Sequence, residues 1–484
     1  MLSIRKEDKI LLKAVFRFSQ SQKVKLYIVG GYLRDILLNR QKENPDIDFS
    51  IKKGAIKFAK ALSKKIKAGF VVLDKERGCC RLIKKIKDKI YTLDFADFRG
   101  SDLGQDLLHR DFTINAIALS LDKAISEKNF DKWLIDPELG RQDIKAKILR
   151  RVNKRSFDED GLRILRAFSL ASIFGFRIEK ETLKQIKLKK TKLSGVSYER
   201  IRDELFKILS RPCAYQYLSQ LDKLGILKTI MPEIEIMRGV KQGPYHHLDV
   251  LMHAFETLRQ VEIIIEEKKN NKEISGYLNQ VISGERKRLA LVKLAAFLHD
   301  IGKPEALRYE NGKTIFHGHE RVGAILSEKI GEKFKLSNDE LKALKKMVFW
   351  HLRPGYLADM HSLSARAKFR YFRDCAQEGA SVLLISLADQ RSTRGPLTSR
   401  QSRQRHEKAV SILLKEYFKK QKEQKLSRLV NGNDLMDKLK IAPGILVGRI
   451  LSELEELQAA GTIKTKEDAL RLAAKIKNRE RRGG

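Results

Sequence analysis

The stretch VGGYLRDILLNRQKENPDIDF, residues 29–49, decides the fold of the amino-terminal part of the chain. It begins with a glycine pair after an apolar run and ends with acidic residues that alternate with Ile47 and Phe49. This period of two is typical of a half-buried strand, so Asp46 and Asp48 are expected on one face. Neighbouring carboxylates repel each other unless a cation lies between them and a ligand, and Mg²⁺ suits such oxygens. The alternative is an acidic strand edge that is merely solvated.

The glycine pair points to a phosphate-bearing ligand. Gly30 and Gly31 lie where a predicted strand turns into a helix, and phosphate oxygens can approach backbone amides closely at such a turn. Arg34 adds a fixed positive fork. A glycine pair alone would also suit any tight turn between a strand and a helix. Together with the paired carboxylates, it predicts a site for phosphates and divalent ions.

Hydrophobic periodicity extends this pattern into an α+β unit at residues 1–150. Apolar positions at helical spacing predict one helix within the first 20 residues and another at 55–66. Apolar runs predict strands at 25–31, 45–51, 69–74, 79–86 and 90–98.

Beyond residue 150 the pattern becomes almost wholly helical and predicts three further regions. These are a helical neck at 151–238, a histidine-rich region at 239–395 and a basic helical tail at 396–484. Seven of the ten histidines lie between His246 and His351, which indicates a site rather than scattered use. The segment 391–403, rich in Gly, Pro, Ser and Arg, favours the last boundary.

The composition favours a polyanionic partner. Lys and Arg number 99 against 61 Asp and Glu, a formal net charge of +38 over 484 residues. Such an excess suits nucleic acid, with a merely soluble basic surface as the alternative. A hydrophobic fraction of 42% excludes wholesale disorder, and no uncharged apolar run approaches the roughly 18 residues of a membrane span. The four cysteines form no CxxC pair, which favours a reducing, cytoplasmic location.

Three further motifs complete the pattern of residues 29–49. HRDFTINAIAL spans 109–119, DEDGLRILRAFSLASIFGF spans 158–176 and YERIRDELFKIL spans 198–209. In this order the motifs resemble those of class II tRNA nucleotidyltransferases and bacterial poly(A) polymerases, within the DNA polymerase beta-like superfamily. The resemblance covers about residues 24–212. It implies a polymerase-beta-like nucleotidyltransferase head, a template-independent reaction and Mg²⁺ as cofactor.

The resemblance also implies roles for single residues. Asp46 and Asp48 would hold the catalytic Mg²⁺ ions, and Asp94 matches a third strand carboxylate. Asp160 and Arg163 match the family's pair that contacts the edge of the incoming base, a task for which an acceptor beside a donor fork is suited. The alternative for this pair is an ordinary i, i+3 helix salt bridge. The other implied nucleotide-binding residues are Gly30, Gly31, Arg34, Arg110, Asp111, Asn115 and Arg166.

Two features favour tRNA 3′-end synthesis over poly(A) synthesis. The second motif of poly(A) polymerases usually runs into an aromatic pair, whereas Ala116 to Leu119 follow here, and those enzymes usually lack a histidine-rich third region. The expected partners are therefore tRNA, CTP and ATP. The expected reaction adds C, and as a further option A, to the tRNA 3′ end and releases pyrophosphate. The short segment at 98–109 resembles the CC-adding subtype, which lacks a flexible loop there. The sequence leaves the oligomeric state open.

The histidine-rich region resembles an HD-type metal-dependent phosphohydrolase domain. HHLDVLMHAFETL, LAAFLHDIGKPEAL and SLADQRS occur in the order of that family. The resemblance implies four ligands, His253, His299, Asp300 and Asp389. Imidazole and carboxylate ligands suit Mn²⁺, Ni²⁺, Co²⁺ or Zn²⁺. Additional candidates are His317, His319 and His351. Hydrolysis of phosphoesters at RNA ends or in nucleotides is the rival or second activity, and a purely structural domain is the alternative.

Overall fold

The computed structural model describes residues 2–360, 363–422 and 428–482. The chain forms two compact units. The first comprises Met1–Ile208 with Leu221–Ile230, and the second comprises Leu209–Gln220 with Met231–Gly484.

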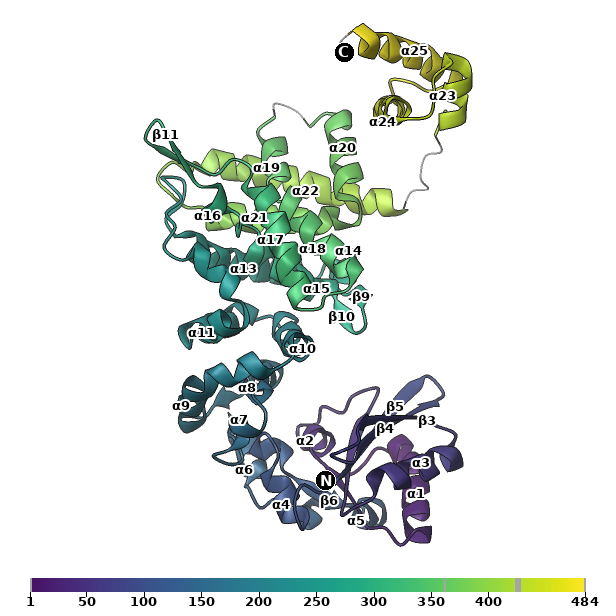
Figure 1. The fold of residues 1–484 in the computed structure, drawn as a ribbon, viewed down its shortest axis with the longest axis vertical. Coiled ribbons are helices and arrows are strands. Elements are labelled where there is room, and N and C mark those ends of the chain that lie inside the picture. The colour runs from purple at the N-terminus through teal and green to yellow at the C-terminus, as the bar shows by residue number, and fades with distance from the viewer. Residues whose placement is uncertain (1, 361–362, 423–427, 483–484) are drawn as a thin grey trace. The chain divides into compact units, whose positions relative to one another are not determined.

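A six-stranded mixed sheet forms the centre of the first unit (Figure 1). Its strands are β1 (Leu26–Val29), β2 (Asp46–Ile51), β3 (Gly69–Asp74), β4 (Cys79–Ile86), β5 (Lys89–Asp97) and β6 (Ala118–Ser120). They lie in the order β3-β4-β5-β2-β1-β6, with β2 and β5 parallel and all other neighbours antiparallel. This register pairs Asp48 with Val29 on one side and with Asp94 on the other.

One face of the sheet is sealed by aromatic side chains from two helices, α1 (Lys6–Ser21) and α3 (Ala55–Ile66). Phe49 stacks on Phe95 with ring centroids 4.8 Å apart, and Phe58 of α3 lies 5.7 Å from Phe95. Phe18 of α1 continues the row at 5.3 Å from Phe58. Because Phe49 faces this core, the alternation of β2 leaves Asp48 on the opposite face.

The rest of the first unit is mainly helical. It contains α2 (Gly31–Leu37), α4 (Leu103–Leu108), η1 (Thr113–Asn115), α5 (Leu121–Ser126), η2 (Asp131–Trp133), α6 (Gly140–Ala146), β7 (Ile148–Leu149), α7 (Ser156–Glu159), α8 (Leu162–Phe174), β8 (Arg177–Ile178), α9 (Lys180–Lys189), η3 (Lys190–Gly195), α10 (Tyr198–Leu209) and α12 (Ile226–Ile230). Helix α8 is buried on almost every side and ends at Gly175, whose φ of +68° suits glycine.

The second unit is a helical assembly with two short hairpins. It contains α11 (Ala214–Lys223), η4 (Pro232–Met237), α13 (Val250–Glu267), α14 (Lys272–Leu278), β9 (Val281–Ser283), β10 (Arg286–Lys287), α15 (Arg288–Leu298), α16 (Lys303–Ala306), β11 (Arg308–Glu310), β12 (Lys313–Ile315), α17 (His319–Lys333), α18 (Asn338–Trp350), α19 (Arg353–Ala358), α20 (Ala365–Cys375), η5 (Ala376–Glu378), α21 (Gly379–Ser392) and α22 (Arg400–Lys422). Helix α15 is buried along its whole length and packs against α13, α18 and α21.

Three further helices follow in the same unit, α23 (Gly432–Leu439), α24 (Ile445–Ala459) and α25 (Lys466–Arg482). They share a small apolar core that includes Leu435 and Ile450. Glu456 of α24 accepts hydrogen bonds from three arginines of α20, at 2.7 to 2.9 Å. These are Arg366, Arg370 and Arg373. The arginines and burial act in opposite directions on Glu456: burial raises its pKa, but the arginines lower it to about 2.

The predicted α+β unit followed by helical regions is confirmed. Every strand predicted for the sheet is present, and the helical pattern misses only short pieces such as β9–β10 and β11–β12. The divisions at residues 150, 238 and 395 stay predictions. Within the described residues, no helix has both the length and the apolar character that crossing a membrane requires.

Candidate active site and metal centre

A glycine turn, a carboxylate and an arginine meet at the end of β1. Val29 pairs with Asp48 across the two strands, and Gly30 follows Val29 with φ +75°. A Cβ atom at Gly30 would lie 2.8 Å from Nη1 of Arg110 and 3.1 Å from Oδ2 of Asp48. Only glycine therefore fits between these two side chains. The backbone turn runs directly beside the Asp48 carboxylate.

Asp46 and Asp48 lie on the same face of β2 but in different surroundings. The Asp46 side chain is 57% exposed and accepts a hydrogen bond from Lys42 at 2.7 Å. Burial raises the pKa of Asp48 to about 6. The carboxylates of Asp94 and Asp46 add to this rise, and Arg110 opposes it. Asp48 is thus a carboxylate whose charged form needs a nearby cation.

This donor set fits a divalent metal ion. Two carboxylates from one strand face can share hard cations, and a bound cation would favour the charged form of Asp48 that burial disfavours. The exposed position of Asp46 leaves room for the water molecules and phosphate oxygens that Mg²⁺ retains as ligands. Asp46 and Asp48 are therefore the residues that would hold Mg²⁺ here.

Asp94 lies beside Asp48 on β5, but Arg81 of β4 occupies its carboxylate. Nε and Nη2 of Arg81 donate to the two oxygens of Asp94, both at 2.8 Å. The two residues are also paired in the register of β4 and β5. Asp94 would have to release Arg81 to bind a metal, so its predicted role stays a prediction. Sequence reasoning did not single out Arg81, because its partner lies on another strand.

Arg34 of α2 is held in place by fixed partners. Its Nη1 donates to Oδ1 of Asn115 at 2.6 Å, and its Nε donates to Asp35 at 2.9 Å. The guanidinium also lies 4.4 Å from the ring centroid of Phe174. Next to it, a Cβ atom at Gly31 would meet Nη2 of Arg34 at 3.3 Å. The fork is thus oriented before any ligand arrives.

A partly buried ion pair joins the second motif to α8. Oδ2 of Asp111 accepts from Nε of Arg166 at 2.7 Å, and Oδ1 accepts from Asn115 at 3.0 Å. Burial alone would raise the pKa of Asp111, but Arg166 and Asn115 lower it to about 2. Arg166 also lies 3.4 Å from Oε1 of Glu204 in α10. Glu204 was missed, although it lies in the motif at 198–209.

The two residues predicted to contact the base have different partners. Asp160 accepts from Nη2 of Arg200 at 2.7 Å, and its side chain is 29% exposed. Arg163 is buried, and its guanidinium donates to backbone carbonyls of the second motif and to Glu159 at 3.1 Å. The side chains of Asp160 and Arg163 form no ion pair with each other in the described structure. Arg200 is the cation beside Asp160, and the sequence reasoning did not single it out.

The second unit gathers histidines and aspartates into one buried cluster. Three overlapping groups each have ligand atoms within 4.8 Å of one another. The groups are His253, His299 and Asp300; His299, His351 and Asp389; and Asp300, His319 and His351. The four ligands that the resemblance implies therefore come together, with His319 and His351 beside them. His317 is exposed and belongs to none of these groups among the described residues.

Hydrogen bonds to the backbone fix the tautomers of three cluster histidines. Nδ1 of His299, His319 and His351 each lies 2.7 to 2.8 Å from the carbonyl oxygen three residues earlier. A carbonyl oxygen only accepts, so Nδ1 carries the proton and donates. The three Nε2 atoms are buried and face carboxylate oxygens, with those of His299 and His319 at 3.1 and 3.2 Å from Asp300. A neutral imidazole with a free Nε2 is the form that binds a metal.

The charges of the cluster also fit a metal ion. Burial opposes the ionisation of Asp300 and Asp389, but neighbouring histidines hold the pKa of both carboxyls well below the usual range. These carboxylates raise the pKa of His299 to about 10 against the effect of burial. A proton on His299 would balance these carboxylates, and it must leave Nε2 before that atom can bind a metal ion. Imidazole and carboxylate donors suit Mn²⁺, Ni²⁺, Co²⁺ or Zn²⁺ in its place.

Lys303 is a further member of this centre that the sequence reasoning missed. Its Nζ lies 2.6 Å from Oδ2 of Asp300 and donates to Oε1 of Gln242 at 2.7 Å. Lys303 follows the His299–Asp300 doublet by one helical turn, and this spacing was the available signal.

Comparisons with known proteins identify the domains in which the two candidate sites lie. Three family models match the chain: a poly A polymerase head domain at 26–150, a probable RNA and SrmB-binding site of polymerase A at 175–237, and an HD domain at 250–394. The A-adding tRNA nucleotidyltransferase of Deinococcus radiodurans is 30% identical over 91% of this chain and 93% of its own. The CC-adding tRNA nucleotidyltransferase of Geobacter sulfurreducens is 28% identical over 93% of this chain and 91% of its own.

Solved structures share the fold. A Thermotoga maritima CCA-adding enzyme, determined in complex with tRNA, has a TM-score of 0.61 and 22% identity. The match covers 97% of this chain and 95% of that chain. The fold therefore extends along nearly the whole length of both proteins.

Proposed function

Because the chain belongs to the tRNA nucleotidyltransferase family, we propose that it extends the 3′ end of tRNA without a template, using CTP and, as a further option, ATP. The observation that carries this proposal is the close approach of Gly30 to Asp48 and Arg110. It puts a tight backbone turn, a carboxylate and a cation at one point. Such a point suits a nucleoside triphosphate with its metal ions.

In the proposed reaction, the terminal ribose hydroxyl attacks the α-phosphate in line. A bond forms between that oxygen and phosphorus, and the bond from phosphorus to pyrophosphate breaks. Divalent ions on Asp46 and Asp48 would activate the attacking oxygen and stabilise the leaving one. The amide of Gly31 and the forks of Arg34 and Arg110 bind the phosphate oxygens, whereas the amide of Gly30 already donates to the carbonyl oxygen of Ile117 at 3.1 Å.

Base selection is assigned to α8 and its surroundings. Asp160 supplies an acceptor, and Arg163 supplies the donor fork that the family resemblance implies. Arg200 orients Asp160 through its ion pair. Asp111 and Arg166 hold the second motif against α8 and thus keep the two sets of residues together.

We place the protein in the CC-adding subtype because the segment after β5 is short and ordered by its own contacts. Asp102 caps α4 by accepting from the amide of Gln105 at 2.9 Å. Asp106 of α4 accepts from Oγ of Ser50 and from the amide of Arg99. The curated relatives include both A-adding and CC-adding enzymes, so the subtype rests on this segment alone.

The test of the reaction uses tRNA that lacks its 3′ CCA end. Purified protein is incubated with this tRNA, Mg²⁺ and labelled CTP or ATP, and products are resolved at single-nucleotide resolution. Addition of two C residues and no A is expected. Efficient addition of the terminal A would reject the CC-adding subtype and leave the family function intact.

The Asp48→Asn variant tests the metal-binding role. Incorporation should fall at least about 1000-fold, because catalysis through bound ions accounts for several kcal/mol of barrier reduction. Binding of tRNA should stay within about twofold of the parent affinity, because phosphates are bound by Lys and Arg side chains and Asp48 is an acid. Asp88→Asn, at an exposed position in the turn between β4 and β5, is the matched control. Incorporation near the parent rate in Asp48→Asn would reject the role.

A second function, phosphoester hydrolysis, is favoured by the metal cluster of the second unit. The cluster contains six candidate ligand residues, and the rings of three of its histidines are oriented by backbone hydrogen bonds. A buried lysine lies beside them. A purely structural core does not require so many polar groups. Hydrolysis of 2′,3′-cyclic nucleotides and of phosphomonoesters is to be measured with Mn²⁺, Ni²⁺, Co²⁺ or Zn²⁺. His299→Ala and Asp300→Ala should abolish it, while His317→Ala should not. Equal rates in all variants would dismiss the cluster as the source.

A further inference from the structure

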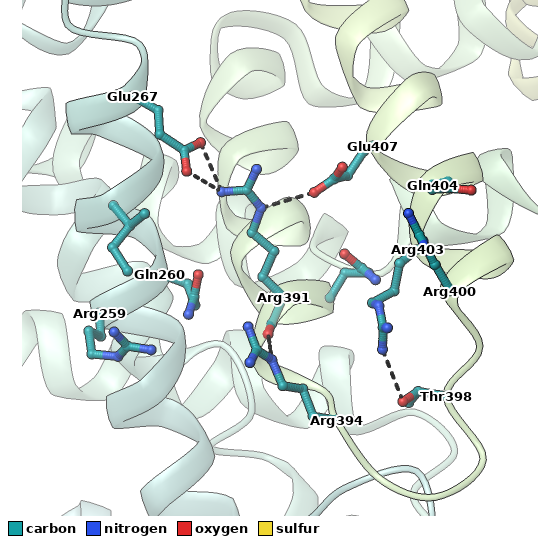
Figure 2. Close-up of a pocket in the computed structure, with 12 residues that line it drawn as sticks. Arg259, Gln260, Glu267, Arg391, Arg394, Thr398, Arg400, Arg403, Gln404 and Glu407 are labelled. Carbon is teal, nitrogen blue, oxygen red and sulfur yellow. Dashed lines mark hydrogen bonds and ion pairs between the residues drawn. The ribbon is translucent and has the colours of Figure 1, made fainter.

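Arginine is the commonest residue lining a cavity of about 740 Å³ in the second unit (Figure 2). The cavity lies among α13, α21, the loop after α21 and α22. Five arginines line it against two glutamates. The arginines are Arg259, Arg391, Arg394, Arg400 and Arg403.

Two of these arginines are neutralised within the protein. Arg391 reaches between two helices, as Figure 2 shows, and pairs with Glu267 at 2.9 Å and with Glu407 at 3.1 Å. Arg259 forms a bidentate pair with Glu256, both bonds at 2.7 Å. These ion pairs connect the elements that form the wall of the cavity, and the glutamates neutralise the charges of Arg259 and Arg391.

The other three arginines lie in no close ion pair among the described residues, although the charge of Arg394 helps to lower the pKa of Glu256. Arg394 donates to the carbonyl oxygen of Arg391 at 3.2 Å, and Arg403 donates to the hydroxyl of Thr398 at 3.4 Å. None of Arg394, Arg400 and Arg403 forms an ion pair in the part of the chain that the structure describes. Three like charges at one cavity repel each other unless an anion joins them. Guanidinium forks match phosphate oxygens in particular.

The loop that carries Arg394 is fixed beside the metal cluster. The amide of Gly395 donates to the carbonyl oxygen of Tyr245 at 2.8 Å, and a Cβ atom at Gly395 would lie 2.3 Å from the carbonyl oxygen of Pro244. His246 follows directly, with its ring 4.8 Å from the ring of His253. The loop is therefore locked to the segment that borders a predicted metal ligand.

The cavity also lies close to the cluster along both helices. Gln390 lines the cavity and directly follows Asp389, and its buried Oε1 makes no hydrogen bond among the described residues. On α13, Gln260 lines the cavity two turns after His253, which is about 10 Å along the helix axis. The amide oxygen of Gln390 is buried, so it gives up no protein hydrogen bond when the side chain turns toward a ligand in the cavity.

We propose that this cavity is a phosphate-binding site that holds ribonucleotide phosphates beside the metal cluster. Arg394, Arg400 and Arg403 bind the phosphate oxygens, and Gln390 accepts a hydrogen bond from a sugar hydroxyl or a base. The site goes beyond nucleotidyl transfer. The ligand is a ribonucleotide chain or a free nucleotide. Only the later hydrolysis of this ligand rests on the proposed hydrolytic function; its binding does not.

The test measures binding without hydrolysis. A fluorescein-labelled hexaribonucleotide is titrated with full-length protein in EDTA, and its anisotropy is followed at several salt concentrations. Replacing Arg394, Arg400 and Arg403 by Ala should weaken binding at least about tenfold. It should also lower the slope of log affinity against log salt by about 2, since each lost contact to a single strand contributes about 0.7. Arg405→Ala, on the exposed side of α22 and outside the cavity, is the matched control and should change little.

Two additions make the result decisive. Replacement of the same three arginines by Lys keeps the charge and should restore most of the salt slope, although not the full affinity. Competition by CMP indicates a free nucleotide as ligand, and competition by unlabelled oligomer alone indicates a strand. The proposal is overturned if the Ala and Arg405→Ala variants bind alike, or if the Lys variant binds no better than the Ala variant. An inactive metal cluster would leave these binding results unchanged, so failure of the hydrolytic function is distinguishable.

Discussion

Replacement of Gly30 by Ala tests the active-site geometry most directly. Gly30 has φ +75° and ψ −136°, a combination that only glycine adopts readily, so the backbone strain costs about 1–3 kcal/mol. The new Cβ would also meet Nη1 of Arg110 at 2.8 Å and Oδ2 of Asp48 at 3.1 Å. Both groups must shift by a few tenths of an ångström or more. Misplacement of a metal-binding carboxylate by about 1 Å costs roughly 100-fold in rate.

Incorporation of CMP into truncated tRNA should therefore fall about 100-fold in Gly30→Ala, with a loss of thermal stability too small to unfold the protein at the assay temperature. Gly54→Ala is the matched control. Gly54 also has a positive φ, +90°, but its Cβ would meet nothing within 4 Å. This variant should lose about 1 kcal/mol of stability and keep its activity. Comparable activity in both variants would refute the idea that the space at Gly30 serves catalysis.

Three further outcomes are expected. Asp111→Asn breaks a partly buried ion pair with Arg166, whose side chain is 38% exposed, and should cost about 1–2 kcal/mol in urea unfolding at pH 7. Because the pKa of Asp111 is lowered to about 2, its stabilisation is complete above about pH 4 and lost as the pH falls through about 2, and acid titration of the variant should lack this component. Glu456→Gln should cost about 2 kcal/mol, measured by the same unfolding, because it weakens charge-assisted hydrogen bonds to α20. Removal of metal by a chelator should lower the melting temperature of the parent protein but not of His299→Ala, since a metal at 100 times its Kd adds about 2.7 kcal/mol.

The fold of the first unit was predictable because local patterns determine it. The alternation around Ile47 and Phe49 places Asp46 and Asp48 on one face, and the observed strand has that face. The glycine pair likewise predicts the turn at Gly30. Long helical stretches such as residues 198–209 were predictable for the same reason, since burial of one helix face leaves a period of 3.6 residues.

What the sequence did not reveal depends on contacts between distant segments. Arg81 reaches Asp94 only because β4 and β5 pair in one particular register. The burial of Arg163 depends on carbonyl groups more than 50 positions away. His319 and His317 are two residues apart, yet only His319 joins the cluster, because the start of α17 turns it inward. The arginine cavity combines α13 with α22, and no local pattern marks such a meeting.

The backbone hydrogen bonds of His299, His319 and His351 have a consequence for how the second unit acquires its ion. Each ring is oriented by a carbonyl of its own neighbourhood, so the orientation of these donors is set by local hydrogen bonds and does not depend on an ion. Folding then need not wait for loading, and one ion can be exchanged for another without rebuilding the helices. The ion found in a purified sample would then depend on which metals the growth medium contained. Competition between metal ions at cellular concentrations is needed to identify the physiological ion.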